Sequence, residues 1–231
     1  MVGAQGFMEK GLYSFGTFIT SRVCLQVPEY QRHYAWDKRQ WEDLWNDMYY
    51  LETGRTHYFG TIILMEKVIH EEMPELWFDR LEIVDGQQRI ATTLILMREI
   101  IAQLEEGRGL SSKHIRKLRE DYLRYESVYK LELLGDDREF FRRYIIEGEE
   151  PCEITTASQD RLKRARQFFI KKLEEVKTRL SSEEFKEFLT QLRRKMDMME
   201  LMVYPIKETI EAARMFNCFF NRIAHHLHHV H

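Results

Sequence analysis

From Leu81 to Leu94 the chain reads LEIVDGQQRIATTL, in which an apolar run meets a helical pattern at a single glycine. The composition of residues 77–84 predicts a strand that leads into this glycine. Apolar residues then recur at helical spacing, and the predicted helix carries Ile90, Leu94, Met97, Ile101 and Leu104 on one face. This strand, turn and helix are the strongest local pattern in the sequence.

Shorter patterns lie on both sides of this unit. The predicted elements are strands over 22–27, 58–65 and 201–206, a hairpin loop over 70–74, a helix that begins after an N-cap at Asp37, amphipathic helices between 111 and 199, and a last helix after 206. Gly and Pro are few, which favours long helices over an all-β sandwich.

Together these elements predict an α+β fold in two parts. Residues 1–108 and 200–223 would form an α/β core with a small mixed sheet, and residues 109–199 would form a helical lobe inserted between its halves. The segment 224–231 contains five histidines. We interpret this segment as a tag or a truncation scar rather than as a metal site.

The composition excludes several classes of protein. Hydrophobic residues make up 44% of the chain and charged residues 32%, which is typical of a globular protein. No apolar run is long enough for a membrane helix, and the start does not read as a secretory signal. The three cysteines, Cys24, Cys152 and Cys218, are far apart, which argues against disulfides and a zinc finger and predicts a cytoplasmic protein.

The turn at residues 85–89 has two interpretations. In the first, Asp85 caps the helix and Gln88 completes a capping box. This leaves Arg89 unexplained, because the helix dipole disfavours a cation in the first turn. In the second, the glycine turn presents free N–H groups to an anion, Arg89 binds phosphate, and Asp85 holds Mg²⁺ or positions water.

A polar and aromatic loop follows the first of these strands and includes Tyr30, Gln31, Arg32, Tyr34 and Trp36. Its aromatic side chains could pack on the core while Arg32 faces solvent. Alternatively, the loop forms a nucleotide pocket in which an aromatic face binds the base and Arg32 binds phosphate. The residues alone leave both interpretations open.

Three motifs occur in order along the chain: Pro28-x-Tyr30-Gln31-Arg32-x-Tyr34-x-Trp36, Tyr58-Phe59-Gly60-Thr61-Ile62 and Ile83-Val84-Asp85-Gly86-Gln87-Gln88-Arg89. Together they resemble the N-terminal domain of GmrSD-type modification-dependent restriction enzymes, a branch of the ParB/sulfiredoxin-like fold. The family continues the third motif as I-T-T-L, where this chain has Ile90-Ala91-Thr92-Thr93-Leu94. A later family motif resembles Glu211-Ala212, Phe216 and Asn221-Arg222, with Ile223 in place of a glycine.

The resemblance implies a domain that binds and hydrolyses a nucleoside triphosphate with Mg²⁺ in defence against foreign, modified DNA. It implies hydrolysis by Asp85, Gln87, Gln88 and Arg89, with Asp85 as the metal ligand. The expected nucleotide-binding residues are Tyr30, Gln31, Arg32, Trp36, Gly60, Thr61, Gly86, Thr92, Thr93, Asn221 and Arg222. The alternative is a ParB-like DNA-binding module that a nucleotide switches without being hydrolysed. In either case the chain could form a homo-oligomer.

The sequence has no counterpart of the family's His-Asn-His nuclease domain. We therefore expect a truncated chain or a stand-alone subunit that does not cut DNA by itself and works with a nuclease domain or subunit. Residues 158–179 contain eight Lys or Arg against three acidic residues. This stretch is either a solvated helix face or a surface that contacts DNA phosphates through Lys163, Arg164, Arg166 and Lys171.

Overall fold

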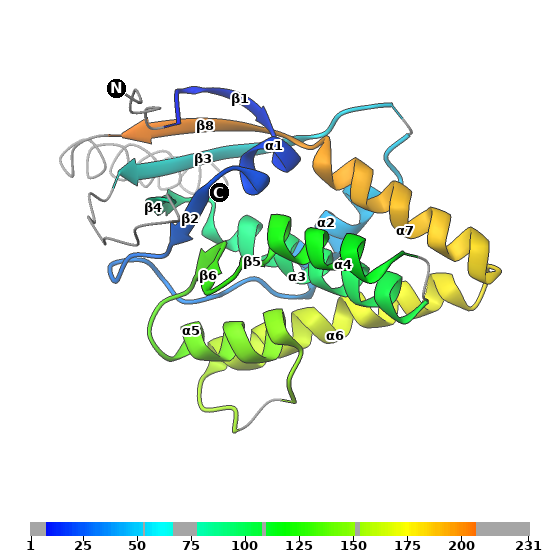
Figure 1. The fold of residues 1–231 in the computed structure, drawn as a ribbon. Helices are drawn as coiled ribbons and strands as arrows, with labels where there is room; N and C mark the ends of the chain where they lie inside the picture. Colours follow the sequence, from blue (N-terminus) through cyan, green and yellow to red (C-terminus); the bar gives the residue numbers. More distant parts are fainter. Residues whose placement is uncertain (1–7, 53, 67–77, 108–109, 151–152, 207–231) are drawn as a thin grey trace, which may run out of the picture.

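The computed structural model describes residues 8–52, 54–66, 78–107, 110–150 and 153–206 (Figure 1). In these residues the chain forms a six-stranded mixed sheet, a separate two-stranded ribbon, and helices that gather beside the main sheet. This arrangement confirms the predicted α+β class.

The elements have the following bounds. The main sheet contains β1 (Gly11–Ser14), β2 (Val23–Gln26), β3 (Tyr58–Glu66), β4 (Asp79–Asp85), β7 (Leu131–Glu132) and β8 (Glu200–Ile206), and the ribbon contains β5 (Arg124–Tyr125) and β6 (Val128–Tyr129). The helices are α1 (Phe15–Thr20), α2 (Lys38–Tyr49), α3 (Gln87–Glu106), α4 (Ser112–Tyr122), α5 (Asp136–Phe140) with a π-helical continuation over Phe141–Glu147, α6 (Ala157–Lys177) and α7 (Ser182–Asp197).

The strand order of the main sheet is β1-β8-β3-β4-β2-β7. β8 lies parallel to β3 and antiparallel to β1, so segments from opposite ends of the described chain lie side by side (Figure 1). β4 pairs with β3 antiparallel and with β2 parallel. Because β2 leads into residues 28–36, β3 carries 58–62 and β4 leads into 85–89, three adjacent strands bring the three motifs together.

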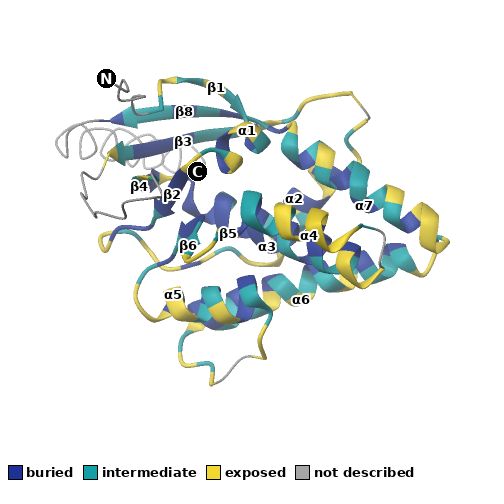
Figure 2. Ribbon diagram, viewed as in Figure 1, coloured by how far each residue is buried: buried dark blue, intermediate teal, exposed yellow. Residues whose placement is uncertain are grey.

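α3 is the central helix of the hydrophobic core. Its apolar residues Ile90, Leu94, Met97, Ile101 and Leu104 are at most 2% exposed, as the helical spacing predicts. α4, α6 and α7 all contact α3, and Figure 2 shows it as a buried helix among them. The turn that begins α3 is therefore fixed by the packing of the whole helix.

Most predicted elements are confirmed. The helix after Asp37 begins as expected, because the Asp37 side chain accepts a hydrogen bond from the Arg39 N–H and forms a capping box with Gln40. β1, α1 and the two-residue strands β5, β6 and β7 are not predicted. The hairpin loop at 70–74 and the helix after 206 lie outside the described residues.

The proposed division between residues 1–108 with 200–223 and residues 109–199 stays a prediction. β7 belongs to the second segment and pairs with β2 of the first. One hydrophobic cluster includes Leu94 of the first segment together with Leu162 and Leu189 of the second. None of the helices in the described part of the chain is long and apolar enough to span a membrane.

A buried ion pair fastens α6 to α3. Glu99 is 4% exposed, and its Oε1 accepts hydrogen bonds from Arg98 Nη1 at 2.9 Å and from Arg166 Nε at 2.8 Å. Arg166 Nη1 also donates to the Tyr144 carbonyl at 2.8 Å. If Arg166 is removed, the buried carboxylate of Glu99 loses one of the two cations that compensate for its charge.

We predict that Arg166→Leu lowers the stability of the protein strongly. Breaking a buried pair costs about 3–5 kcal/mol, which should lower the melting temperature by roughly 10 °C in a chain of this size. Arg164→Ala is the matched control, because Arg164 is exposed and lies 3.7 Å from Asp160. Thermal unfolding followed by circular dichroism measures both, and equal melting temperatures would contradict the buried-pair assignment.

Candidate functional site

β4 ends at an exposed carboxylate, and a glycine in the left-handed conformation follows it. The side chain of Asp85 is 57% exposed, and Gly86 follows with φ +100°, in the left-handed region that favours glycine. A Cβ atom at Gly86 would lie 2.3 Å from Ile62 Cδ1 of β3. The left-handed conformation therefore favours glycine at this position, and a Cβ would also press on the end of the Ile62 side chain.

The first interpretation of this turn, in which Asp85 caps the helix and Gln88 completes a capping box, is wrong. Gly86, and not Asp85, is the N-cap of α3, and no side chain forms a cap hydrogen bond there. Gln88 points instead to the loop that follows β2. Among the described residues, no side chain accepts a hydrogen bond from the first N–H groups of this 20-residue helix, while Gly86, Gln87 and Gln88 are themselves buried.

Arg89 lies in a bulge of β3. The β3–β8 register shifts between Tyr58 and Gly60, and the guanidinium donates to the Phe59 carbonyl at 2.9 Å and the Thr61 carbonyl at 2.7 Å. Its Nη2 also donates to Asp85 Oδ2 at 3.1 Å.

Gly60 leaves room for this guanidinium, because a Cβ there would lie 1.9 Å from Arg89 Nη1. The expected role of Arg89 as a free phosphate ligand therefore does not match its contacts, which are structural.

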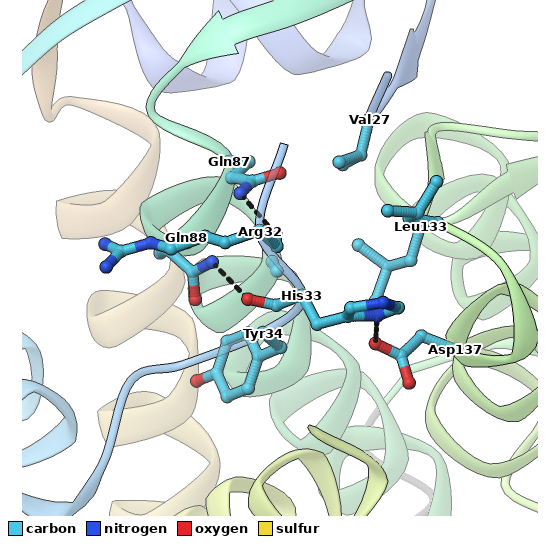
Figure 3. Close-up of a pocket in the computed structure, with 10 residues that line it drawn as sticks. Val27, Arg32, His33, Tyr34, Gln87, Gln88, Leu133 and Asp137 are labelled. Atoms are coloured by element: carbon cyan, nitrogen blue, oxygen red, sulfur yellow. Dashed lines mark hydrogen bonds and ion pairs between the residues drawn. The ribbon is translucent and has the colours of Figure 1, made fainter. Parts of the chain in front are cut away.

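Glutamine side chains hold the loop of residues 28–36 against the turn. Gln31 Nε2 donates to the Val84 carbonyl at 2.7 Å, and Gln87 Nε2 donates to the Arg32 carbonyl at 2.8 Å. Gln88 Oε1 accepts from the Ala35 N–H at 2.8 Å, while its Nε2 donates to the His33 carbonyl at 3.1 Å. Figure 3 shows the amides of Gln87 and Gln88 directed at the loop backbone.

Thr92 and Thr93 lie inside the protein. Both are fully buried, and their hydroxyls donate to the carbonyls of Gln88 and Arg89 one turn earlier. Tyr34 contacts Thr92 Oγ1 at 2.8 Å and accepts from Trp41 Nε1, and burial raises the pKa of Tyr34 far above its usual value. In this structure neither threonine hydroxyl can reach a ligand, so their place in the motif reflects packing.

The remaining loop residues differ in exposure. Tyr30 is exposed, and the burial of part of its ring, together with Glu82, raises its pKa. Trp36 packs on the core, while Gly60 and Thr61 lie half-buried in β3. The guanidinium of Arg32 is exposed, forms no hydrogen bond or ion pair with the described residues, and points away from Leu133 (Figure 3).

His33 and Asp137 form a contact that the sequence does not predict. His33 Nδ1 donates to Asp137 Oδ2 at 2.8 Å, although the two residues are 104 positions apart. Asp137 is 1% exposed and also accepts hydrogen bonds from Ser158 Oγ at 2.5 Å and Thr156 Oγ1 at 3.4 Å. Only the position of His33 inside the first motif could have drawn attention to this pair.

These residues enclose little empty space. Val27, Arg32, His33, Gln87 and Asp137 are among those that line a cavity of about 10 Å³, which is room for roughly one water molecule. The described residues contain no group of three or more His, Cys, Asp or Glu side chains that could hold a metal ion. The cavity between these residues is therefore too small to hold a nucleotide.

The predicted DNA-binding residues separate into two kinds. Arg166 is engaged with Glu99, which corrects the expectation that it faces DNA. Arg164 and Lys171 on α6 are exposed, and Lys163 is half-buried.

Asn221 and Arg222, which were expected to bind the nucleotide, lie outside the described residues.

The fold and the site define a mixed α+β domain in which one loop is clasped to a strand–glycine–helix turn. Residues 15–221 match the family model described as the N-terminal domain of the GmrSD restriction endonuclease. The chain therefore belongs to this family and is a domain of a restriction system. No curated protein matches the chain.

We predict unequal effects on stability for the two arginines of the site. Arg89→Ala leaves two carbonyls of β3 without a donor, and the loss of charge-assisted hydrogen bonds should cost roughly 3 kcal/mol. Arg32→Ala removes an exposed side chain and should change stability by less than about 0.5 kcal/mol. Urea unfolding of both variants measures the difference, and equal midpoints would contradict the role of Arg89 in the bulge.

Proposed function

We propose that the chain is the nucleotide domain of its restriction system, and that it binds and hydrolyses a nucleoside triphosphate at the turn of residues 85–89. One observation carries this proposal: the N-terminus of α3 has no side-chain cap. Its N–H groups concentrate the positive end of the helix dipole, which favours a phosphate group. Membership of the restriction-enzyme family supports the same assignment.

Arg32 is the candidate phosphate ligand among the arginines of the motifs. Its neighbour in the site, Arg89, already donates to two carbonyls and to Asp85. Arg32 is exposed and free of described partners, and its backbone is held beside α3 by Gln87. A planar guanidinium of this kind can bind phosphate oxygens in a bidentate manner.

A phosphate-bound Mg²⁺ fits the same turn. Asp85 pairs with Arg89 through Oδ2, and Oδ1 has no partner among the described residues. One carboxylate together with substrate phosphates is a common Mg²⁺ environment, which supports a site at Asp85. Mg²⁺ would neutralise phosphate charge, while Oδ1 of Asp85 would hold it or orient the attacking water.

A nucleotide switch without hydrolysis is the second candidate. The contact between Asp85 and Arg89 favours it, because a carboxylate already paired with a cation attracts a metal ion less strongly. Stabilisation of the protein by nucleotide without phosphate release would support this alternative.

DNA contact and a nuclease partner complete the proposal. Lys163, Arg164 and Lys171 project from α6, and such cations can neutralise DNA phosphates. The nuclease chemistry would belong to another domain or subunit, since the family model that matches describes the N-terminal domain of a restriction endonuclease.

We predict that Asp85→Asn abolishes hydrolysis and leaves the fold intact. The exposed ion pair with Arg89 is worth less than about 1 kcal/mol, so the melting temperature should change little. Asp43→Asn, an exposed position on α2, is the control. Phosphate release is measured with each nucleoside triphosphate and Mg²⁺. Full activity of Asp85→Asn would remove the central residue of the enzymatic proposal.

We also predict that replacing the three cations of α6 with alanine weakens DNA binding. The slope of log affinity against log salt should become shallower by up to about 2.7, because three phosphate contacts are lost. The matched control removes three exposed cations of α4, namely Lys113, Arg116 and Lys117. Equal losses in both variants would show that only net charge matters and would contradict a DNA surface on α6.

A further inference from the structure

The loop that carries Arg32 is held from two sides. On one side the amides of Gln87 and Gln88 bind the carbonyls of Arg32 and His33. On the other side the ring of His33 binds Asp137 of α5, as Figure 3 shows. Arg32, the proposed phosphate ligand, thus belongs to a short backbone segment that hydrogen bonds hold on both sides.

Asp137 is a buried, hydrogen-bonded carboxylate and not a surface charge. It is 1% exposed, and its carboxylate accepts hydrogen bonds from Ser158 and Thr156 at the beginning of α6. No Lys or Arg of the described residues pairs with it, so His33 is its one ionisable partner there. The carboxylate can only accept, which fixes Nδ1 of His33 as the donor and orients the ring.

We propose that Asp137 and His33 are a positioning pair for the nucleotide loop. Asp137 acts through the His33 ring, whose residue gives its carbonyl to Gln88, and Gln88 in turn receives the Ala35 N–H. The pair thereby keeps the loop in the one conformation that places Arg32 beside the turn. Nucleotide binding by this chain then depends on α5 and α6 as well as on the motifs, a step that rests on the proposed function.

The first test needs no nucleotide. His33→Ala removes the anchor, and His33→Gln keeps a side-chain N–H that can donate to Asp137. Amide hydrogen exchange of residues 34–36 should be about tenfold faster in His33→Ala, since a bond to a carboxylate is lost, and should return towards the wild-type rate in His33→Gln. His114→Ala is the control, because His114 pairs with Ser111 on α4, away from the loop.

The second test measures the nucleotide. In His33→Ala the KM for the nucleoside triphosphate should rise severalfold with kcat unchanged. The reason is that only a fraction of the molecules would have the loop in the conformation that binds nucleotide. His33→Gln should restore the wild-type KM. If the substitution merely destabilised the whole protein, hydrogen exchange would be faster along the whole chain, and His33→Gln would not restore the wild-type KM.

The outcomes separate the two proposals. Unchanged exchange at 34–36 in His33→Ala would overturn the positioning pair, whatever the nucleotide results. Faster exchange with an unchanged KM would overturn its role in nucleotide binding. A wild-type chain that binds no nucleotide would overturn the proposed function, while the exchange rates would still decide whether Asp137 and His33 hold the loop.

Discussion

The contact of Arg89 with the bulge of β3 fixes the geometry of the whole site. A cation in the first turn of a helix opposes the helix dipole, and this one is only 22% exposed. Two carbonyls of β3 and the carboxylate of Asp85 compensate for that placement. The bulge turns these carbonyls towards α3, and Gly60 provides the space. These contacts join the strand, the turn and the helix, and they hold the Asp85 carboxylate beside Arg89.

The loop of residues 28–36 follows from the same requirement for paired backbone groups. A loop that crosses the start of a helix brings carbonyls and N–H groups into a partly buried place, where unpaired groups are costly. A glutamine carries both a donor and an acceptor, so Gln88 can serve the His33 carbonyl and the Ala35 N–H at once. A glutamate could accept from Ala35 but could not donate to His33. The chemistry of the loop backbone thus explains why amides stand at 87 and 88.

Long periodic elements and the three motifs could be predicted from the sequence, whereas contacts between distant segments could not. α3 could be predicted because its apolar residues recur at helical spacing and are buried. β3, β4 and β8 could be predicted because each is a short apolar run with clear ends. β7 could not be predicted because it has two residues, too few to show an alternation of apolar and polar side chains. Arg89 was expected to face a ligand because nothing local reveals the bulge that it fills. Asp137 gives no sign of its role, since its partner lies 104 residues away.

Packing and ligand chemistry meet at Gly86. A helix that begins without a cap would ordinarily gain from Ser, Asp or Asn at this position. Here any other residue would have to adopt a positive φ, and its Cβ would press on the end of the Ile62 side chain. The left-handed conformation therefore favours glycine, which lacks the side-chain acceptor that most helices use. Because the N–H groups of α3 then have no acceptor from their own N-cap, an incoming anion meets no competing side chain at that position. The same turn that packs α3 against the sheet leaves the helix N-terminus without a side-chain cap, and Asp85 is the exposed residue of that turn.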